Sequence, residues 1–285
     1  MRSAHHPLTP LVFIAPAVIV LGVFVVTGFM QTIGYSLTRY TAFREPVYIG
    51  LDNYVRLFSS DRFWLCLLNS AIYLLVTPAL IVLSLTAAIT VEANLRGMKW
   101  LRLALFLPVI TPTLVGSVAW RILLKDDGVI NTILGVVGID AVRWLTDYPF
   151  TLVSAMFVTL WKGFGFYMMI FLAALLAVPG ELKEAASIDG ASRFQVFRNV
   201  TLPAIRPAIV LVAIVSSISA LKVFEEIFVT VRGGPITQQT VVPLIYRVAF
   251  EEGEYGLASA IGFVLFLVIL VFSLVNLFLA RRAGS

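Results

Sequence analysis

The sequence predicts an all-α membrane protein with six transmembrane helices. Hydrophobic residues make up 60% of its 285 residues and charged residues only 13%, whereas soluble globular domains contain about 25% charged residues. The mean hydropathy is +0.96. Long runs without an acidic or basic residue recur along the chain, and about 20 helical residues are enough to cross a bilayer core. Most of the chain therefore has lipid as its solvent.

Six apolar runs are long enough to cross the bilayer. They are expected to be helices, because a lone apolar strand would leave backbone groups unsatisfied in hydrocarbon. The first run is longer than the apolar part of a signal peptide, and Ala15-Pro16-Ala17 lies inside it, so we interpret it as an uncleaved helix. Residues 1–285 are taken as one transmembrane domain with spans at about 10–34, 63–91, 103–121, 150–178, 205–231 and 256–280.

Composition also argues against several other kinds of site and partner. The 21 Lys and Arg residues give a net charge of +5, but they flank the apolar runs, so we expect no nucleic-acid partner. A single cysteine, Cys66, excludes an internal disulfide and a cysteine-based metal site. The two histidines, His5 and His6, lie outside the apolar runs, so no metal site is predicted.

Six spans place both termini on the same side of the membrane. The two sides carry nearly equal numbers of basic residues, but the short loop 92–102 is dense in them, with Arg96, Lys99 and Arg102. Short loops are where basic residues mark the cytoplasmic side. We therefore expect both termini in the cytoplasm, together with this loop and the loop at 179–206.

The loop at 179–206 predicts two short helices separated by a turn. Pro179-Gly180 ends the fourth span, and strong helix formers follow from Glu181 to Ile188. Asp189-Gly190 is a turn signal, and Ser192 is suited to cap the second helix. The apolar side chains of this water-facing loop fit a helix lying on the bilayer surface or a helix that docks into a groove of a soluble partner. The residue pattern alone leaves both interpretations open.

Three segments of this loop resemble a known family. Glu184-Ala185-Ala186, Asp189-Gly190-Ala191 and Leu202-Pro203 resemble the EAA motif of ABC importer permeases in residue type and spacing. Other segments are similar to maltose-type sugar permeases, in particular to the first permease subunit, over nearly the whole chain: Gly50 to Tyr54, Phe171 to Leu175, Gly233 to Pro235 and Tyr255 to Ala260. Val231-Arg232 departs from the family pattern, which has small or polar residues there.

The resemblance implies a type I ABC importer permease fold with a cytoplasmic coupling helix. It implies import of a sugar or related polyol by alternating access, across the bacterial plasma (inner) membrane. The partners that it implies are a second homologous permease subunit, a dimer of ABC ATPases and an extracytoplasmic substrate-binding protein. The chain has no G-x-x-x-x-G-K-[ST] loop, so we expect it to be no enzyme and to hold no cofactor, with ATP and Mg bound by the partner ATPase.

The resemblance also assigns roles within the loop. Glu184 would make a charged contact with the ATPase, Ala185 and Ala186 would permit close approach, and Gly190 would supply the bend between the two helices. The full set of implied coupling residues is Glu184, Ala185, Ala186, Ile188, Asp189, Gly190, Phe194, Phe197, Leu202 and Pro203. Phe194 and Phe197 follow a three-residue rhythm along one side of the second helix.

Six side chains at membrane depth are candidates for the substrate pathway: Trp161, Lys162, Tyr167, Lys222, Glu225 and Glu226. A charge there costs about 2.5–3.5 kcal/mol on insertion scales. A sugar could hydrogen-bond to Lys162 or Tyr167 and stack on Trp161. Lys162 can equally pair with a carboxylate or extend along the helix to an interface. The last three candidates, near the outer end of the fifth span, fit a gate or a subunit interface better than a sugar site.

Two other functions compete with the importer permease. An ion-coupled secondary transporter could use Lys162 with Glu225 or Glu226 as a proton relay. A membrane enzyme would need a nucleophile and a base in the spans, and no such arrangement of His or Cys is present. An ion-coupled carrier has no use for an EAA loop, so the sequence favours the importer permease without naming its solute.

Overall fold

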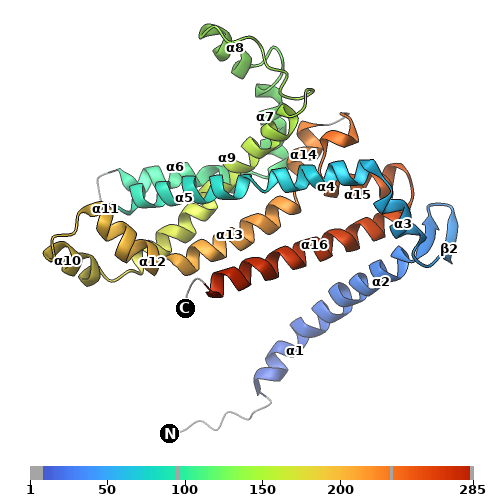
Figure 1. Ribbon diagram of the computed structural model, residues 1–285, viewed down its shortest axis with the longest axis horizontal. Coiled ribbons are helices and arrows are strands. Elements are labelled where there is room, and N and C mark those ends of the chain that lie inside the picture. Colours follow the sequence, from blue (N-terminus) through green and yellow to red (C-terminus); the bar gives the residue numbers. More distant parts are fainter. Residues whose placement is uncertain (1–8, 94–96, 232–233, 283–285) are drawn as a thin grey trace. The chain divides into compact units, whose positions relative to one another are not determined.

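The computed structural model describes residues 9–93, 97–231 and 234–282, which are mostly helical with one two-stranded sheet (Figure 1). The chain forms two compact units. Unit 1 comprises Met1–Asp61 and Ile245–Leu267, and unit 2 comprises Arg62–Leu244 and Val268–Ser285. Arg232 and Gly233 of the sequence resemblance lie outside the described residues.

Unit 1 contains the first long helix, a β-hairpin, a short helix and the start of the last helix. Its elements are α1 (Thr9–Leu21), the π-helical turn η1 (Gly22–Val26), α2 (Thr27–Ser36), β1 (Thr38–Thr41), β2 (Arg44–Tyr48), α3 (Asp52–Phe58), the end of α15 (Val241–Tyr246), the π-helical turn η4 (Arg247–Glu251) and the start of α16 (Tyr255–Arg282). The stretch Phe13–Ser36 has a mean hydropathy of 2.5, and none of its most apolar window is buried. A helix that is apolar on all sides needs lipid or another protein around it.

The β-hairpin contacts α3 at Asn53 and α16 at Gly256. β1 and β2 pair antiparallel, with Thr38 opposite Tyr48. The buried Asn53 side chain donates two hydrogen bonds of 2.8 Å, to the carbonyl oxygens of Ser36 and Thr38. A methyl group at Gly256 would collide with the same Thr38 carbonyl. The two segments that contain Asn53 and Gly256 both carry the family resemblance, and they meet at this one carbonyl group.

Unit 2 is a helical bundle with α9 at its centre. Its elements are α4 (Asp61–Tyr73), α5 (Val76–Glu92), α6 (Met98–Ile110), α7 (Thr113–Leu123), α8 (Val129–Val136), α9 (Phe150–Leu176), α10 (Gly180–Ile188), α11 (Arg193–Val196), the π-helical turn η2 (Phe197–Thr201), α12 (Leu202–Ala204), α13 (Arg206–Leu221), α14 (Glu225–Thr230), the 3₁₀ turn η3 (Ile236–Gln238) and parts of α15 and α16. α9 packs against α5, α6, α7, α13 and α14. Its Met168 and Phe171 are fully buried, together with Tyr73 of α4.

Two glycines on α9 allow its neighbours to approach closely. A methyl group on Gly165 would collide with the backbone carbonyl of Leu105 in α6. A methyl group on Gly163 would lie 3.3 Å from Cδ2 of Leu80 in α5, which is the end of a flexible side chain. Small residues of this kind let helix backbones come together in membranes, where packing is the main source of helix association.

Among the described residues, four helices are long and apolar enough to cross a membrane, and up to six spans result if two bent pairs are included. The four are Phe13–Ser36, Asp61–Glu92, Phe150–Leu176 and Tyr255–Phe278. Two pairs of helices qualify only when taken together: Met98–Ile110 with Thr113–Leu123, and Arg193–Ala204 with Arg206–Leu221. Six spans result if each pair is counted once, and six is the number that the sequence predicts.

Both pairs are sharply bent, which the sequence analysis did not anticipate. Within the expected span 103–121, the axes of α6 and α7 differ by 97°. Thr111 between them is extended, with ψ of 128°, because a residue before a proline, here Pro112, is disfavoured in the helical conformation. In the expected span 205–231, α13 ends at Leu221 and the chain becomes helical again only in α14. The 65° bend of the second pair is a separate feature and lies at Ile205, where this expected span begins.

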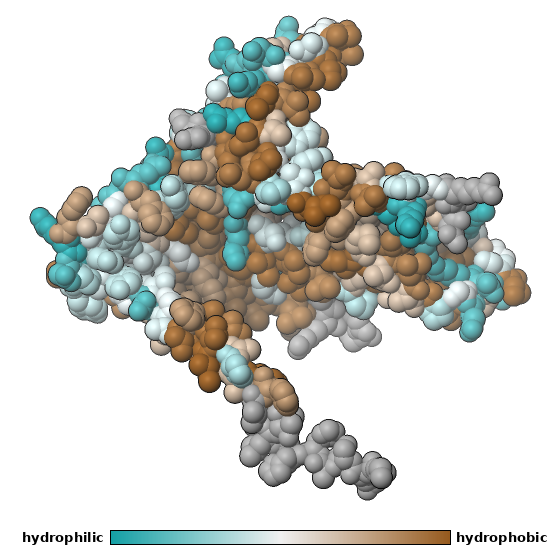
Figure 2. Space-filling view, turned by 180° about the vertical axis from the view of Figure 1, so that it is seen from behind, coloured by the Kyte–Doolittle hydropathy of each residue, from teal (hydrophilic) through white to brown (hydrophobic). Residues whose placement is uncertain are grey.

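Figure 2 shows hydrophobic side chains spread over the outer faces of the unit 2 helices, with hydrophilic ones at the α10–α11 end and around α8. Leu83 of α5, Leu107 of α6 and Leu211 of α13 are each at least 50% exposed. Contiguous apolar surface of this kind marks a lipid or protein contact. The α10–α11 end is therefore one water-facing end of unit 2.

Candidate functional site

The loop between α9 and α13 forms the predicted pair of short helices. α10 begins directly after Pro179 and ends at Ile188. Gly190 follows with φ of +84°, a left-handed conformation that costs other residues about 1–2 kcal/mol. Ser192 then starts α11 with a capping box, in which its hydroxyl accepts from the Gln195 backbone N–H and the Gln195 side chain accepts from the Ser192 N–H. The predicted helices, turn and cap are all confirmed.

Most of the predicted coupling residues lie on the surface. Ile188 is 86% exposed and Phe194 is 68% exposed. Glu184, Ala185, Asp189, Gly190 and Pro203 are exposed as well, and Ala186, Phe197 and Leu202 are half-buried. Two large apolar side chains held in water on either side of a glycine turn are suited to enter a groove on another protein.

Phe197 does not share the surroundings of Phe194, although the sequence analysis placed both along one side of a helix. Phe197 begins η2 and lines a cavity of about 370 Å³ between this loop and the ends of α5 and α9. Lys183 and Thr201 line the same cavity. Phe194 is therefore the aromatic side chain that a partner can reach, and Phe197 braces the loop from inside.

Two contacts hold the end of α5, one to the α10 loop and one to α6. The Lys183 ammonium lies 2.8 Å from a carboxylate oxygen of Glu92, and both side chains are about two-thirds or more buried, with exposures of 30% and 26%. The Arg102 guanidinium donates to the Val91 carbonyl from Nε at 3.1 Å and Nη2 at 2.5 Å. The sequence analysis missed both contacts, because their partners come from separate segments and no local pattern relates them.

Lys162, in the middle of α9, has a hydroxyl as its hydrogen-bond partner and a carboxylate within electrostatic range. Its ammonium donates a hydrogen bond to Thr113 Oγ1 of α7, and it interacts electrostatically with Glu226 of α14. α14 packs against both α7 and α9. Nearby, the hydroxyls of Tyr73 and Thr159 are 2.7 Å apart, and Tyr73 also interacts electrostatically with Glu226. The structure thus brings together Lys162 and Glu226, which are far apart in the sequence.

The other pathway candidates occupy separate positions. Trp161 packs edge-to-face on Trp120 of α7, with ring centroids 5.8 Å apart. Tyr167 is buried. Lys222 and Glu225 are exposed at the break between α13 and α14. Within the described ranges, no three His, Cys, Asp or Glu side chains gather closely enough to hold a metal ion.

Comparison with known proteins connects this geometry to a family. Residues 7–285 match the family model described as binding-protein-dependent transport system inner membrane component. The chain is 33% identical to the trehalose/maltose transport system permease protein of Thermococcus litoralis, over 94% of this chain and 92% of the relative. It is 32% identical to the diacetylchitobiose uptake system permease protein of Streptomyces coelicolor, over 96% and 83% of the two chains.

A solved structure has the same fold. It is the crystal structure of a bacterial ABC transporter involved in the import of the acidic polysaccharide alginate, with a TM-score of 0.84, 25% identity and coverage of 96% of this chain and 95% of that chain. The family match spans almost the whole sequence, including the coupling loop and every candidate pathway residue. The chain is therefore a multi-pass membrane protein of the binding-protein-dependent transport system inner membrane component family, the permease subunits of ABC importers.

Proposed function

We propose that this permease moves a neutral sugar or polyol, delivered by an extracytoplasmic binding protein, through a pathway that it forms with a second permease subunit. The named relatives that transport trehalose, maltose and diacetylchitobiose support a carbohydrate. Lys162 is compatible with a neutral one, because its ammonium already donates a hydrogen bond within the protein, to Thr113, and has an acid, Glu226, within electrostatic range. A charge left unbalanced at this depth would favour an anionic solute and would be costly when the site is empty.

The energy comes from a dimer of ABC ATPases, which bind ATP and Mg and meet this chain at the α10–α11 loop. The observation that carries this assignment is the exposure of Ile188 and Phe194 on either side of the Gly190 turn. In the proposed contact these two side chains enter a groove of the ATPase, and Glu184 pairs with a basic residue at its edge. Closure of the ATPase dimer then moves the loop and switches the pathway from inward-open to outward-open as a rigid-body change.

The Lys183–Glu92 ion pair connects the coupling loop mechanically to the membrane-spanning helices. The pair joins α10 to the end of α5, and α5 packs along α9. α9 carries Lys162 and Trp161. Force applied to the loop would therefore reach the polar cluster through two rigid helices, with no flexible linker between them.

The same ion pair supports the proposed topology. It places the end of α5 and the α10 loop at one end of unit 2, so the loop at 92–102 and the coupling loop face the same side. Both termini are then cytoplasmic, and the bacterial inner membrane is the location.

Lys162, Trp161 and Glu226 are our proposed pathway residues in unit 2. A sugar hydroxyl would replace Thr113 as a partner of Lys162, and the aromatic surface of Trp161 suits the apolar face of a sugar ring. Tyr167, Lys222 and Glu225 fit less well as substrate contacts. Tyr167 is buried, and the two charged side chains point to solvent-accessible surface at the helix break.

The charge-reversal variant Glu184→Lys tests the coupling assignment. Glu184 is exposed and has no ion pair within the described residues, so the variant should insert and fold normally. Glu181→Lys is the matched control, because Glu181 is an exposed acid on the same helix, one turn earlier. In proteoliposomes with the complete transporter, Glu184→Lys should abolish substrate-stimulated ATP hydrolysis and uptake, while Glu181→Lys should retain most of both. Normal ATP-driven uptake by Glu184→Lys would refute the docking role.

A further inference from the structure

The start of α6 presents two basic side chains beside an open apolar groove. The groove has a volume of about 270 Å³ and is lined by Lys99, Trp100, Arg102, Leu103, Phe106 and Met169. Lys99 and Arg102 are three residues apart, which places them on one side of the helix. The apolar members continue from them along α6 towards the middle of the span, and Met169 of α9 forms the facing wall.

Neither basic residue is neutralised by the protein. No carboxylate in the described part of the chain forms an ion pair with Lys99 or Arg102. Arg102 bonds the Val91 carbonyl through Nε and Nη2, which fixes the guanidinium and leaves donors from its five N–H groups available. The two cations at the edge of the apolar surface are therefore available to an anion from outside the chain.

Trp100 indicates that Lys99, Arg102 and the start of the groove lie at the level of the membrane interface. Its side chain is 73% exposed, and exposed tryptophans next to spans lie at the depth of the lipid headgroups. The three features lie in the same order as the parts of a phospholipid. The basic residues match the phosphate, Trp100 the glycerol region, and the apolar groove an acyl chain.

We propose that this groove binds an anionic phospholipid, with the phosphate on Lys99 and Arg102 and one acyl chain along Leu103, Phe106 and Met169. Basic pockets between transmembrane helices on the cytoplasmic side recognise anionic headgroups in this way. The cytoplasmic location rests on the proposed function, since it is the side of the coupling loop.

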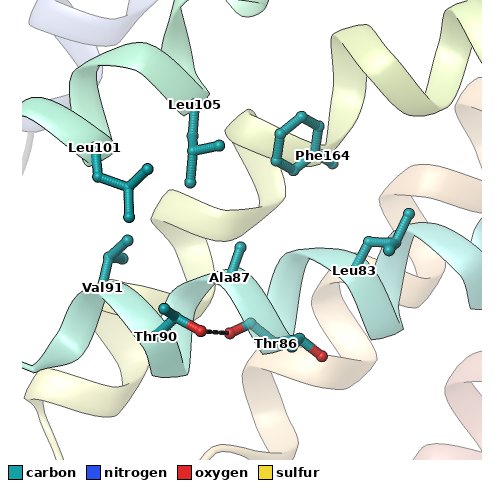
Figure 3. A pocket seen from close by; sticks show the side chains of 8 residues that line it. All are labelled: Leu83, Thr86, Ala87, Thr90, Val91, Leu101, Leu105 and Phe164. Carbon is teal, nitrogen blue, oxygen red and sulfur yellow. Dashed lines mark hydrogen bonds between the residues drawn. The ribbon is translucent and has the colours of Figure 1, made fainter. Parts of the chain in front are cut away.

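A second groove on the other flank of α6 provides a place for the second acyl chain. It has a volume of about 380 Å³ between α5, α6 and α9 (Figure 3). In Figure 3, Leu101 and Leu105 extend from α6 towards Val91 and Ala87 of α5, with Phe164 of α9 beside them. The hydroxyls of Thr86 and Thr90 donate hydrogen bonds to carbonyls of their own helix. The methyl groups of these two residues therefore line the groove, where they can contact an acyl chain. A diacyl lipid could therefore straddle α6.

The site joins the two segments that would move together during transport. Arg102 touches both the proposed phosphate position and the Val91 carbonyl, and the next residue of α5, Glu92, is paired with Lys183 of the coupling loop. A bound lipid would thus brace the α5–α6 turn on the side where force from the ATPase arrives.

Native mass spectrometry of the purified, complete transporter tests the proposal, with added phosphatidylglycerol or phosphatidylcholine as the probe. The wild type should retain phosphatidylglycerol in preference to phosphatidylcholine. Lys99→Gln should weaken phosphatidylglycerol binding about fivefold, the equivalent of about 1 kcal/mol for one basic residue near an anionic surface. Lys125→Gln is the matched control, because Lys125 is exposed but lies after α7, away from the groove. Leu103→Trp, at a 53% exposed position, should fill the groove and reduce retention of both lipids.

Three results would overturn the proposal. They are equal retention of the two lipids by the wild type, equal losses in Lys99→Gln and Lys125→Gln, and absence of bound lipid because another subunit covers the groove. The Glu184→Lys transporter separates this proposal from the proposed function. It should lose coupled uptake and keep its phosphatidylglycerol, so a failure of either result identifies which proposal is wrong.

Discussion

Gly165→Ala and Gly163→Ala test whether close backbone approach holds α6 against α9. Both glycines lie inside the same helix, two residues apart, so each substitution should gain about the same helix propensity, roughly 1 kcal/mol. The added methyl groups meet different neighbours. At position 165 the neighbour is the Leu105 backbone carbonyl, which cannot move without moving α6, and at position 163 it is a flexible Leu80 side chain at 3.3 Å.

The expected magnitudes follow from that difference. Overpacking against a rigid neighbour costs about 1–3 kcal/mol and occasionally more, which cancels or exceeds the propensity gain at Gly165. A side-chain tip that shifts by a few tenths of an ångström costs little, so Gly163→Ala should be neutral or stabilising. The two variants should therefore differ by about 1–3 kcal/mol, with Gly165→Ala the less stable.

Thermal unfolding of the purified permease in nanodiscs measures this difference, followed by the fluorescence of a thiol dye at the buried Cys66. Because both variants carry the same chemical change on the same helix, effects of lipid and detergent cancel in the comparison. A Gly165→Ala protein at least as stable as Gly163→Ala would refute the reasoning, since α6 would then have room to yield at no cost.

Two further predictions concern contacts that join distant segments. Lys183→Glu and Glu92→Lys should each lower coupled uptake. The double variant should restore it, with a coupling free energy of about 1 kcal/mol for a partly exposed pair; uptake that stays low in the double variant would argue against the anchor. Asn53→Ala should make the β-hairpin more susceptible to limited proteolysis, because two backbone carbonyls lose their donor at a cost of about 1–3 kcal/mol. Exposed Asp52→Ala is its control, and equal cleavage of the two variants would contradict the role of Asn53.

Much of the coupling site could be predicted from local sequence. The helix from Glu181, the Asp189-Gly190 turn and the cap at Ser192 depend on the backbone preferences of neighbouring residues, and such preferences act over a few positions. The different surroundings of Phe194 and Phe197 could not be predicted in this way. Their spacing places them on one side of a helix, but what covers that side depends on where α5 and α9 end.

The bend inside the third predicted span and the helix break inside the fifth show a second limit of the sequence. A count of uncharged residues measures apolar length, which is the same for a straight helix and for two helices at 97°. Pro108 and Pro112 were visible in the sequence, yet prolines are tolerated in membrane helices wherever neighbours satisfy the freed backbone groups. Only the packing against α9 and α14 decides that the chain turns at Pro112.

Composition and local pattern by themselves determined that this chain is a helical membrane protein with six apolar segments and a water-facing pair of short helices. The reason is that lipid selects against charge at every position of a span, so the signal is repeated along each segment. The tertiary structure decided which distant groups interact: Lys162 electrostatically with Glu226, Lys183 with Glu92 in an ion pair, and Asn53 with the Thr38 carbonyl that also lies against Gly256. Each of these interactions depends on how the elements pack, and no local pattern in the sequence records which distant residues become neighbours.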